Sequence, residues 1–121
     1  MSLKPLFVYG TLRAAHPNSA RFGLAGSCDV ITNVVLPGFN IYDLGAFPGI
    51  KPGDGSVVGD LFMVPDELWD RLDAYEGVPH LYTRETVDIA GHEGVQVYVY
   101  GYDVDNRQAI ATGDWLNQNA G

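Results

Sequence analysis

Short runs of apolar and β-branched residues alternate with Gly and Pro along most of the chain. This pattern is typical of strands joined by tight turns. Strands are predicted at residues 6–9, 30–36, 39–44, 57–64, 82–89 and 95–102. The last of these is apolar or aromatic on both faces, which indicates a strand buried on both sides. Residues 45–55 are rich in Gly and Pro and are predicted to form a loop, and Pro37-Gly38 is expected to separate the second strand from the third.

Helical periodicity is convincing in one segment, residues 67–75. Asp66 is the expected N-cap of this helix, and Gly77 is the residue expected to end it. Shorter helices are expected after Pro17 and around Trp115. Because strands dominate and short links join them, the pattern predicts an α+β domain with one central helix and a curved antiparallel sheet or small barrel.

The length of 121 residues is that of a single domain spanning residues 1–121, large enough to bury a core. A net charge of −8 argues against nucleic acid or an anionic membrane as the main partner. No apolar stretch approaches the ~20 residues that a membrane helix needs, and the N-terminus does not resemble a secretory signal. The single cysteine, Cys28, excludes an internal disulfide. These features predict a soluble protein of the reducing cytoplasm.

Glu76 interrupts the amphipathic pattern of the predicted helix. The apolar stripe of that helix consists of Leu68, Trp69, Leu72 and Tyr75, and its solvent side of Asp66, Asp70 and Asp73. Glu76 falls between Leu72 and Trp69, within the stripe. Burial there, together with the helix C-terminus, would raise its pKa and make it a proton donor and acceptor near neutral pH. The alternative is that the helix frays at its end and Glu76 turns into solvent.

A second candidate feature is the segment Phe7-Val8-Tyr9-Gly10-Thr11-Leu12-Arg13. A buried strand that ends in Gly-Thr exposes several backbone N–H groups at its tip, and Gly10 lets a ligand approach the backbone closely. Such a turn can hold a carboxylate or a developing oxyanion. The alternative is an ordinary junction between a strand and a turn, without a ligand.

Other motifs are excluded by their spacing. Residues 53–59 lack both the spacing of a dinucleotide-binding motif and a phosphate-binding lysine. Residues 103–107 resemble the start of a calcium loop, but Arg107 occupies a ligand position. The three histidines, His16, His80 and His92, are scattered, so no metal site is predicted.

In order and spacing, these motifs resemble the γ-glutamylcyclotransferase-like family, which includes the γ-glutamylamine cyclotransferases and AIG2-like proteins. The Tyr-Gly-Thr-Leu loop at residues 9–12 is followed by Gly59-Asp60-Leu61-Phe62 and by Leu72-Asp73-Ala74-Tyr75-Glu76-Gly77. The strand at residues 82–87 and Gly113-Asp114-Trp115 then continue the resemblance nearly to the end of the chain.

The resemblance implies a barrel-like sheet with the main helix packed beside a cavity. It also implies the reaction: a γ-glutamyl amine or γ-glutamyl amino acid cyclises to 5-oxoproline and releases the free amine. In this family the acid/base glutamate corresponds to Glu76, and substrate binding to Tyr9, Gly10, Thr11, Leu12 and, more weakly, Tyr82. No metal or cofactor is implied, and the partner is a small γ-glutamyl substrate. The alternative is a non-catalytic module on the same fold that binds a small carboxylate or regulates. The sequence does not indicate an oligomeric state.

Overall fold

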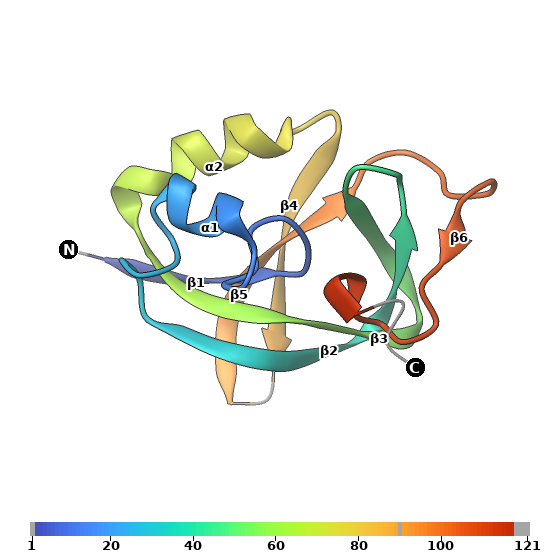
Figure 1. The fold of residues 1–121 in the computed structure, drawn as a ribbon, viewed down its shortest axis with the longest axis horizontal. Coiled ribbons are helices and arrows are strands. Elements are labelled where there is room, and N and C mark those ends of the chain that lie inside the picture. Colours follow the sequence, from blue (N-terminus) through green and yellow to red (C-terminus); the bar gives the residue numbers. More distant parts are fainter. Residues whose placement is uncertain (1, 90, 118–121) are drawn as a thin grey trace.

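Six strands form one sheet in the computed structural model, which describes residues 2–89 and 91–117. The strands are β1 (Leu3–Val8), β2 (Val30–Asp43), β3 (Pro48–Pro65), β4 (Tyr82–Ile89), β5 (His92–Tyr100) and β6 (Gln108–Ala109). The helical elements within these residues are α1 (Pro17–Phe22), α2 (Trp69–Glu76) and the 3₁₀ turns η1 (Asp66–Leu68) and η2 (Trp115–Asn117). Figure 1 shows α1 lying beside α2.

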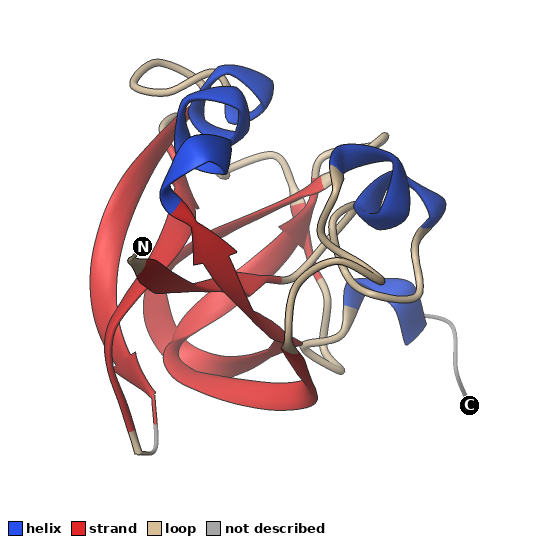
Figure 2. Cartoon of the chain, turned by 90° about the vertical axis from the view of Figure 1, so that its left-hand side faces the viewer, coloured by secondary structure: helices blue, strands red, loops and turns tan. Residues whose placement is uncertain are grey.

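The sheet is mostly antiparallel and strongly curved. Its order is β4-β5-β1-β3-β2-β6, and only β1 and β5 run parallel to each other. The long β2–β3 hairpin bends, so that the sheet wraps round on itself (Figure 2). The predicted α+β fold with a small, curved, barrel-like sheet is therefore confirmed. No helix among the described residues is long and apolar enough to cross a membrane.

Two hydrophobic clusters cover the two faces of the sheet, because successive side chains of a strand point to opposite sides. In β1, Leu6 and Val8 belong to one cluster, and Phe7 belongs to the other together with Tyr9, just beyond the strand. The cluster of Leu6 and Val8 also contains Leu72 of α2. The main helix thus packs on one face of β1, while the opposite face lines the interior of the curved sheet.

The predicted burial of β5 on both faces is confirmed. Val95 and Val97 are fully buried in one cluster, whereas Tyr98 and Tyr100 are buried in the other. Beyond the strand, Tyr102 is exposed. A hydrophobic cluster packs on each face of β5, and both of its edges are paired, with β4 and with β1.

The prediction of a loop over residues 45–55 is wrong for most of that range, because β3 begins at Pro48. Residues 48–52 pair with residues 39–43 of β2 in a regular antiparallel register. A Cβ atom at Gly49 would lie 2.8 Å from the Cβ of Tyr100, so this glycine allows close packing between strands. The predicted break at Pro37-Gly38 is likewise wrong, since β2 continues through it with a shift in register.

The main helix ends where the sequence predicted, but it begins at a different residue. A 3₁₀ turn at Asp66–Leu68 precedes α2, and the N-cap of α2 is Leu68 rather than Asp66, with no side-chain cap. As predicted, the helix ends at Gly77, which has a φ of 68°. The expected burial of Tyr75 is wrong: the side chain is 45% exposed and packs edge-on against Phe22, with ring centroids 5.3 Å apart.

Candidate functional site

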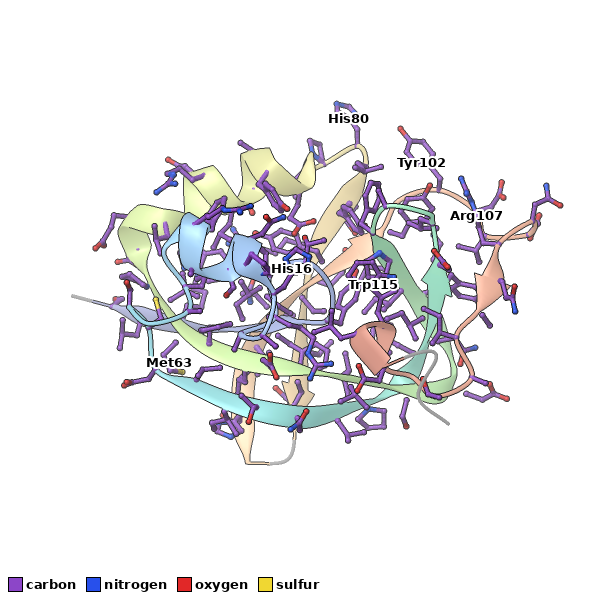
Figure 3. The ribbon with its side chains drawn as sticks, viewed as in Figure 1. His16, Met63, His80, Tyr102, Arg107 and Trp115 are labelled. Carbon is purple, nitrogen blue, oxygen red and sulfur yellow. The ribbon has the colours of Figure 1, made fainter. Side chains whose placement is uncertain are left out.

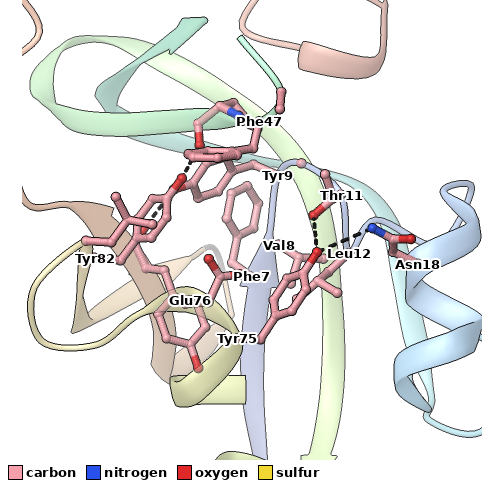
Figure 4. A pocket seen from close by; sticks show the side chains of 15 residues that line it. Phe7, Val8, Tyr9, Thr11, Leu12, Asn18, Phe47, Tyr75, Glu76 and Tyr82 are labelled. Carbon is pink, nitrogen blue, oxygen red and sulfur yellow. Dashed lines mark hydrogen bonds between the residues drawn. The ribbon is translucent and has the colours of Figure 1, made fainter. Parts of the chain in front are cut away.

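A cavity of about 360 Å³ lies where the loop after β1, the start of β3, the end of α2 and the start of β4 meet. Figure 4 shows the side chains around it. All six residues that the sequence singled out line this cavity: Tyr9, Gly10, Thr11, Leu12, Glu76 and Tyr82. The structure thus brings together two segments that are more than 60 residues apart in the chain.

The loop after β1 lines the cavity with Gly10, Thr11 and Leu12. The N–H of Arg13 donates to the carbonyl of Gly10 at 3.1 Å, which closes a tight turn. Within the described part of the chain, the N–H groups of Gly10, Thr11 and Leu12 have no hydrogen-bond acceptor. A Cβ atom at Gly10 would lie only 2.7 Å from the ring of Pro48, so this position requires glycine for close approach. These N–H groups can therefore bind an anionic group.

A buried ion-pair cluster holds this loop in place from behind. Arg13 and Asp60, which are 4% and 2% exposed, approach within 3.3 Å through Nη2 and Oδ1. Arg13 also donates through Nη1 to Oδ1 of Asp114 at 2.7 Å and through Nη2 to Oδ1 of Asn33 at 3.0 Å. Asp60 accepts the N–H of Ala14 at 2.8 Å. The sequence reasoning missed this cluster, although an aspartate inside an apolar strand was a visible signal.

Glu76 is the last residue of α2, and its partly buried side chain lines the cavity. The helix does not fray before it, because the N–H of Gly77 still donates to the carbonyl of Ala74. Burial raises the pKa of the Glu76 carboxyl from 4.5 to about 7. Glu76 is the only acidic residue among the described residues that line the cavity. The site therefore contains a carboxyl group that can gain or lose a proton near neutral pH.

Two tyrosines in the cavity wall use their hydroxyl groups for internal hydrogen bonds. Tyr9 donates to the carbonyl oxygen of Tyr98 at 2.6 Å, and Tyr82 donates to that of Pro48 at 2.6 Å. Burial, with a smaller contribution from the charge of Glu76, raises the pKa of both Tyr9 and Tyr82 above the usual value. Both phenols stay neutral, and both hydroxyl groups are engaged by backbone carbonyl groups of the protein.

The sequence reasoning missed a polar group at the cavity that joins the loop to both helices. The hydroxyl of Tyr75 lies 3.0 Å from Oγ1 of Thr11 and accepts Nδ2 of Asn18 at 3.3 Å. Figure 4 shows these two contacts as dashed lines. Because the loop and the helix are 64 residues apart, no local pattern signals their contact. Asp73, which was expected in solvent, instead accepts the Tyr98 hydroxyl at 2.8 Å.

The histidines have positions that fit structural roles. Nδ1 of His16 accepts the N–H of Asn18 at 3.1 Å and so caps α1, and its ring stacks on Trp115. His80 is exposed on the link between α2 and β4, and Figure 3 shows it at the outer edge of the molecule. Among the described residues, no group of three or more His, Cys, Asp or Glu side chains is placed to hold a metal ion.

A partly open cavity with one carboxyl group among its described lining residues, beside the loop Gly10–Leu12, can accept a small acid or amide. The family described as "Gamma-glutamyl cyclotransferase, AIG2-like" matches residues 6–117. The chain belongs to this family.

Sequence and structure comparisons agree with this assignment. The chain is 30% identical to the Escherichia coli protein described as "Gamma-glutamylcyclotransferase family protein YtfP", over 94% of this chain and 97% of that one. The solution structure of YtfP from Escherichia coli superimposes with a TM-score of 0.73 at 26% identity, covering 95% of this chain and 98% of the other. The crystal structure of PH0828 from Pyrococcus horikoshii shares the fold, with a TM-score of 0.76 at 20% identity, covering 93% and 89%.

Proposed function

We propose that this protein is a cyclotransferase that converts a γ-glutamyl amine or γ-glutamyl amino acid into 5-oxoproline and a free amine. The observation that carries the proposal is the position of Glu76, a carboxyl group with a pKa near neutrality in the same cavity as the loop Gly10–Leu12. Membership of the family supports the same reaction.

The loop and the helix end have separate tasks in this proposal. The N–H groups of Gly10, Thr11 and Leu12 bind the α-carboxylate of the glutamyl unit or the oxyanion that develops at its γ-carbonyl. The rings of Tyr9 and Tyr82 confine the substrate. Confinement matters because the reacting groups belong to one molecule, and holding them in a near-attack geometry removes much of the barrier.

Glu76 moves two protons in turn from the α-nitrogen to the leaving nitrogen. Its carboxylate takes a proton from the α-ammonium group, and the freed amine attacks the γ-carbonyl carbon. A new C–N bond closes the five-membered ring. The bond from that carbon to the leaving nitrogen then breaks as Glu76 returns the proton to this nitrogen. The ring nitrogen still carries a second proton, which it loses to Glu76, and Glu76 passes this proton to the departing amine, so that 5-oxoproline and an ammonium ion are released. Atoms and charge balance without another reactant, so a single carboxyl group with a raised pKa suffices.

The test is the release of 5-oxoproline from a panel of γ-glutamyl amines, γ-glutamyl amino acids and glutathione. Wild type is compared with Glu76→Gln, which removes the titratable group, and with Glu67→Gln, which makes the same change at an exposed position in η1. We expect release by wild type and Glu67→Gln, and none above background by Glu76→Gln.

Two other outcomes contradict the proposal in different ways. Release by Glu76→Gln at the wild-type rate would remove Glu76 from the reaction. Binding of 5-oxoproline or a γ-glutamyl compound without release by any variant, seen as a raised melting temperature, would instead support a non-catalytic carboxylate-binding module on this fold.

A further inference from the structure

The cavity has two chemically different walls. The polar wall consists of the loop Gly10–Leu12 with Asn18 and Tyr75. The opposite wall, here called the aromatic wall, consists of Ala46, Phe47, Pro48, Leu81 and Tyr82. In Figure 4, Phe47 and Tyr82 lie away from Thr11 and Asn18, and Glu76 lies between the two groups.

The described side chains of the aromatic wall offer an anion neither a cation nor a free hydroxyl donor. The hydroxyl of Tyr82 already donates to the carbonyl of Pro48 at 2.6 Å, and the Phe47 ring packs against the Tyr82 ring with centroids 6.3 Å apart. The other side chains of this wall are aliphatic. No Lys, Arg or His occurs among the described residues that line the cavity. Glu76, the charged residue of the described lining, repels a carboxylate when it is ionised.

The reaction places the leaving group against this wall. When the glutamyl unit is held at the loop Gly10–Leu12, its γ-carbonyl must lie near Glu76, which returns the proton to the leaving nitrogen. The closing ring occupies the side of the carbonyl that faces the loop. The leaving group therefore extends to the other side of Glu76, toward Phe47 and Tyr82.

We propose that the aromatic wall binds the leaving amine and selects γ-glutamyl compounds whose leaving group is apolar and carries no carboxylate. This inference rests on the cyclotransferase function proposed above. A carboxylate moved from water to this wall would lose hydration without gaining a cation or a side-chain donor, which is unfavourable. An apolar amine gains free energy from the same transfer.

The volume of the cavity permits such a leaving group. An apolar cavity of ~150 Å³ holds a benzene ring, and the cavity here measures about 360 Å³. Space therefore remains for the glutamyl unit beside a ring of this size. The tilted Phe47 and Tyr82 rings offer both a face and an edge to an aromatic leaving group.

Three compounds test the preference: γ-glutamyl-phenethylamide, γ-glutamyl-phenylalanine and γ-glutamyl-phenylalaninamide. The first two differ only by the carboxylate on the leaving group, and the third replaces that carboxylate with a neutral group of similar size. We expect kcat/KM for the two compounds with an uncharged leaving group to exceed kcat/KM for γ-glutamyl-phenylalanine by at least about tenfold. Equal values for all three would overturn the inference. So would a value for the amide as low as that for the acid, because size rather than charge would then decide.

A substitution in the cavity wall tests the same inference. Ala46 is exposed at the edge of the aromatic wall, and Ala46→Lys adds an ammonium group there. Ala111→Lys adds the same charge at an exposed position outside the cavity. We expect Ala46→Lys to reduce the preference for phenethylamide over phenylalanine by about tenfold and Ala111→Lys to leave it unchanged. An equal effect of both variants would mean that net charge, not the wall, sets the preference.

The experiment separates failure of this inference from failure of the proposed function. Release of 5-oxoproline from all three compounds at equal rates would leave the cyclotransferase intact and remove the selective wall. If neither these compounds nor those of the panel described above release 5-oxoproline, the proposed function fails. Calorimetric binding of the same compounds to wild type then measures the preference directly, and equal affinities would overturn it.

Discussion

The burial of Glu76 has a consequence for stability that can be measured without a substrate. In the folded protein the pKa of this carboxyl is about 7, whereas in the unfolded chain it returns to 4.5. Between these two values the folded state holds a proton that the unfolded state has lost. Stability contributed by this proton is therefore complete below pH 4.5 and is lost as the pH rises toward 7.

The size of this effect follows from the two pKa values. Each pKa unit corresponds to ~1.4 kcal/mol. The change in the pKa from 4.5 to about 7 therefore makes the free energy of unfolding about 3 kcal/mol lower at pH 8 than at a pH below 4.5. The substitution Glu76→Gln removes the titration. We expect the difference in unfolding free energy between Glu76→Gln and wild type to shift in favour of the variant by about this amount between pH 4 and pH 8.

The assay is urea unfolding at several pH values, followed by tryptophan fluorescence. Comparing the difference between variant and wild type across pH cancels any constant effect of the amide on packing. Glu67→Gln serves as the control, since Glu67 is exposed. The reasoning would be refuted by a difference that stays flat between pH 4 and pH 8, because Glu76 would then titrate as an ordinary surface carboxyl.

Three further predictions concern activity and the loop. The kcat/KM of wild type is expected to rise with pH up to about 7, where Glu76 ionises, and a rise centred near 4.5 would contradict the assigned proton transfer. Gly10→Ala is expected to lower the unfolding free energy by about 1–3 kcal/mol, because the new Cβ would meet the Pro48 ring at 2.7 Å. The same substitution is expected to weaken the binding of 5-oxoproline measured by calorimetry, and an unchanged affinity would show that the loop does not bind the ligand. Asp60→Asn is expected to destabilise the protein by about 3 kcal/mol in urea at pH 7, because it removes the more deeply buried of the two carboxylates that pair with Arg13, and a loss below about 1 kcal/mol would argue against that ion pair.

The sequence predicted the parts of the fold that local patterns determine. Alternation placed the strand at residues 82–89 with the bounds that the structure has. The helical period placed Glu76 next to buried Leu72, and Gly77 marked the end of the helix. These features depend on side chains a few residues apart, so a periodic pattern can reveal them.

Features that depend on distant pairing were missed or wrongly predicted. The Gly- and Pro-rich start of β3 forms a strand because residues 39–43 of β2 pair with it, and this pairing overrides the local preference for a turn. Arg13 meets Asp114 across 101 residues, and Tyr75 meets Thr11 across 64. The helical period wrongly placed Tyr75 in the core. The period shows which face of a helix a residue lies on, but it does not show how far the sheet extends beneath that face. Tyr75 instead lines the cavity and packs against Phe22 of α1.

The same geometry explains why one carboxyl group at the end of a helix can serve this site. One turn earlier, Leu72 is fully buried, and a carboxylate there would face the sheet without access to a ligand. On the solvent side, as at Asp70, it would keep an ordinary hydration shell. Glu76 lies at the boundary, where packing removes enough water to raise its pKa and the cavity leaves it accessible. The position at which α2 stops, determined by Gly77, therefore sets both the proton affinity of Glu76 and its reach into the cavity.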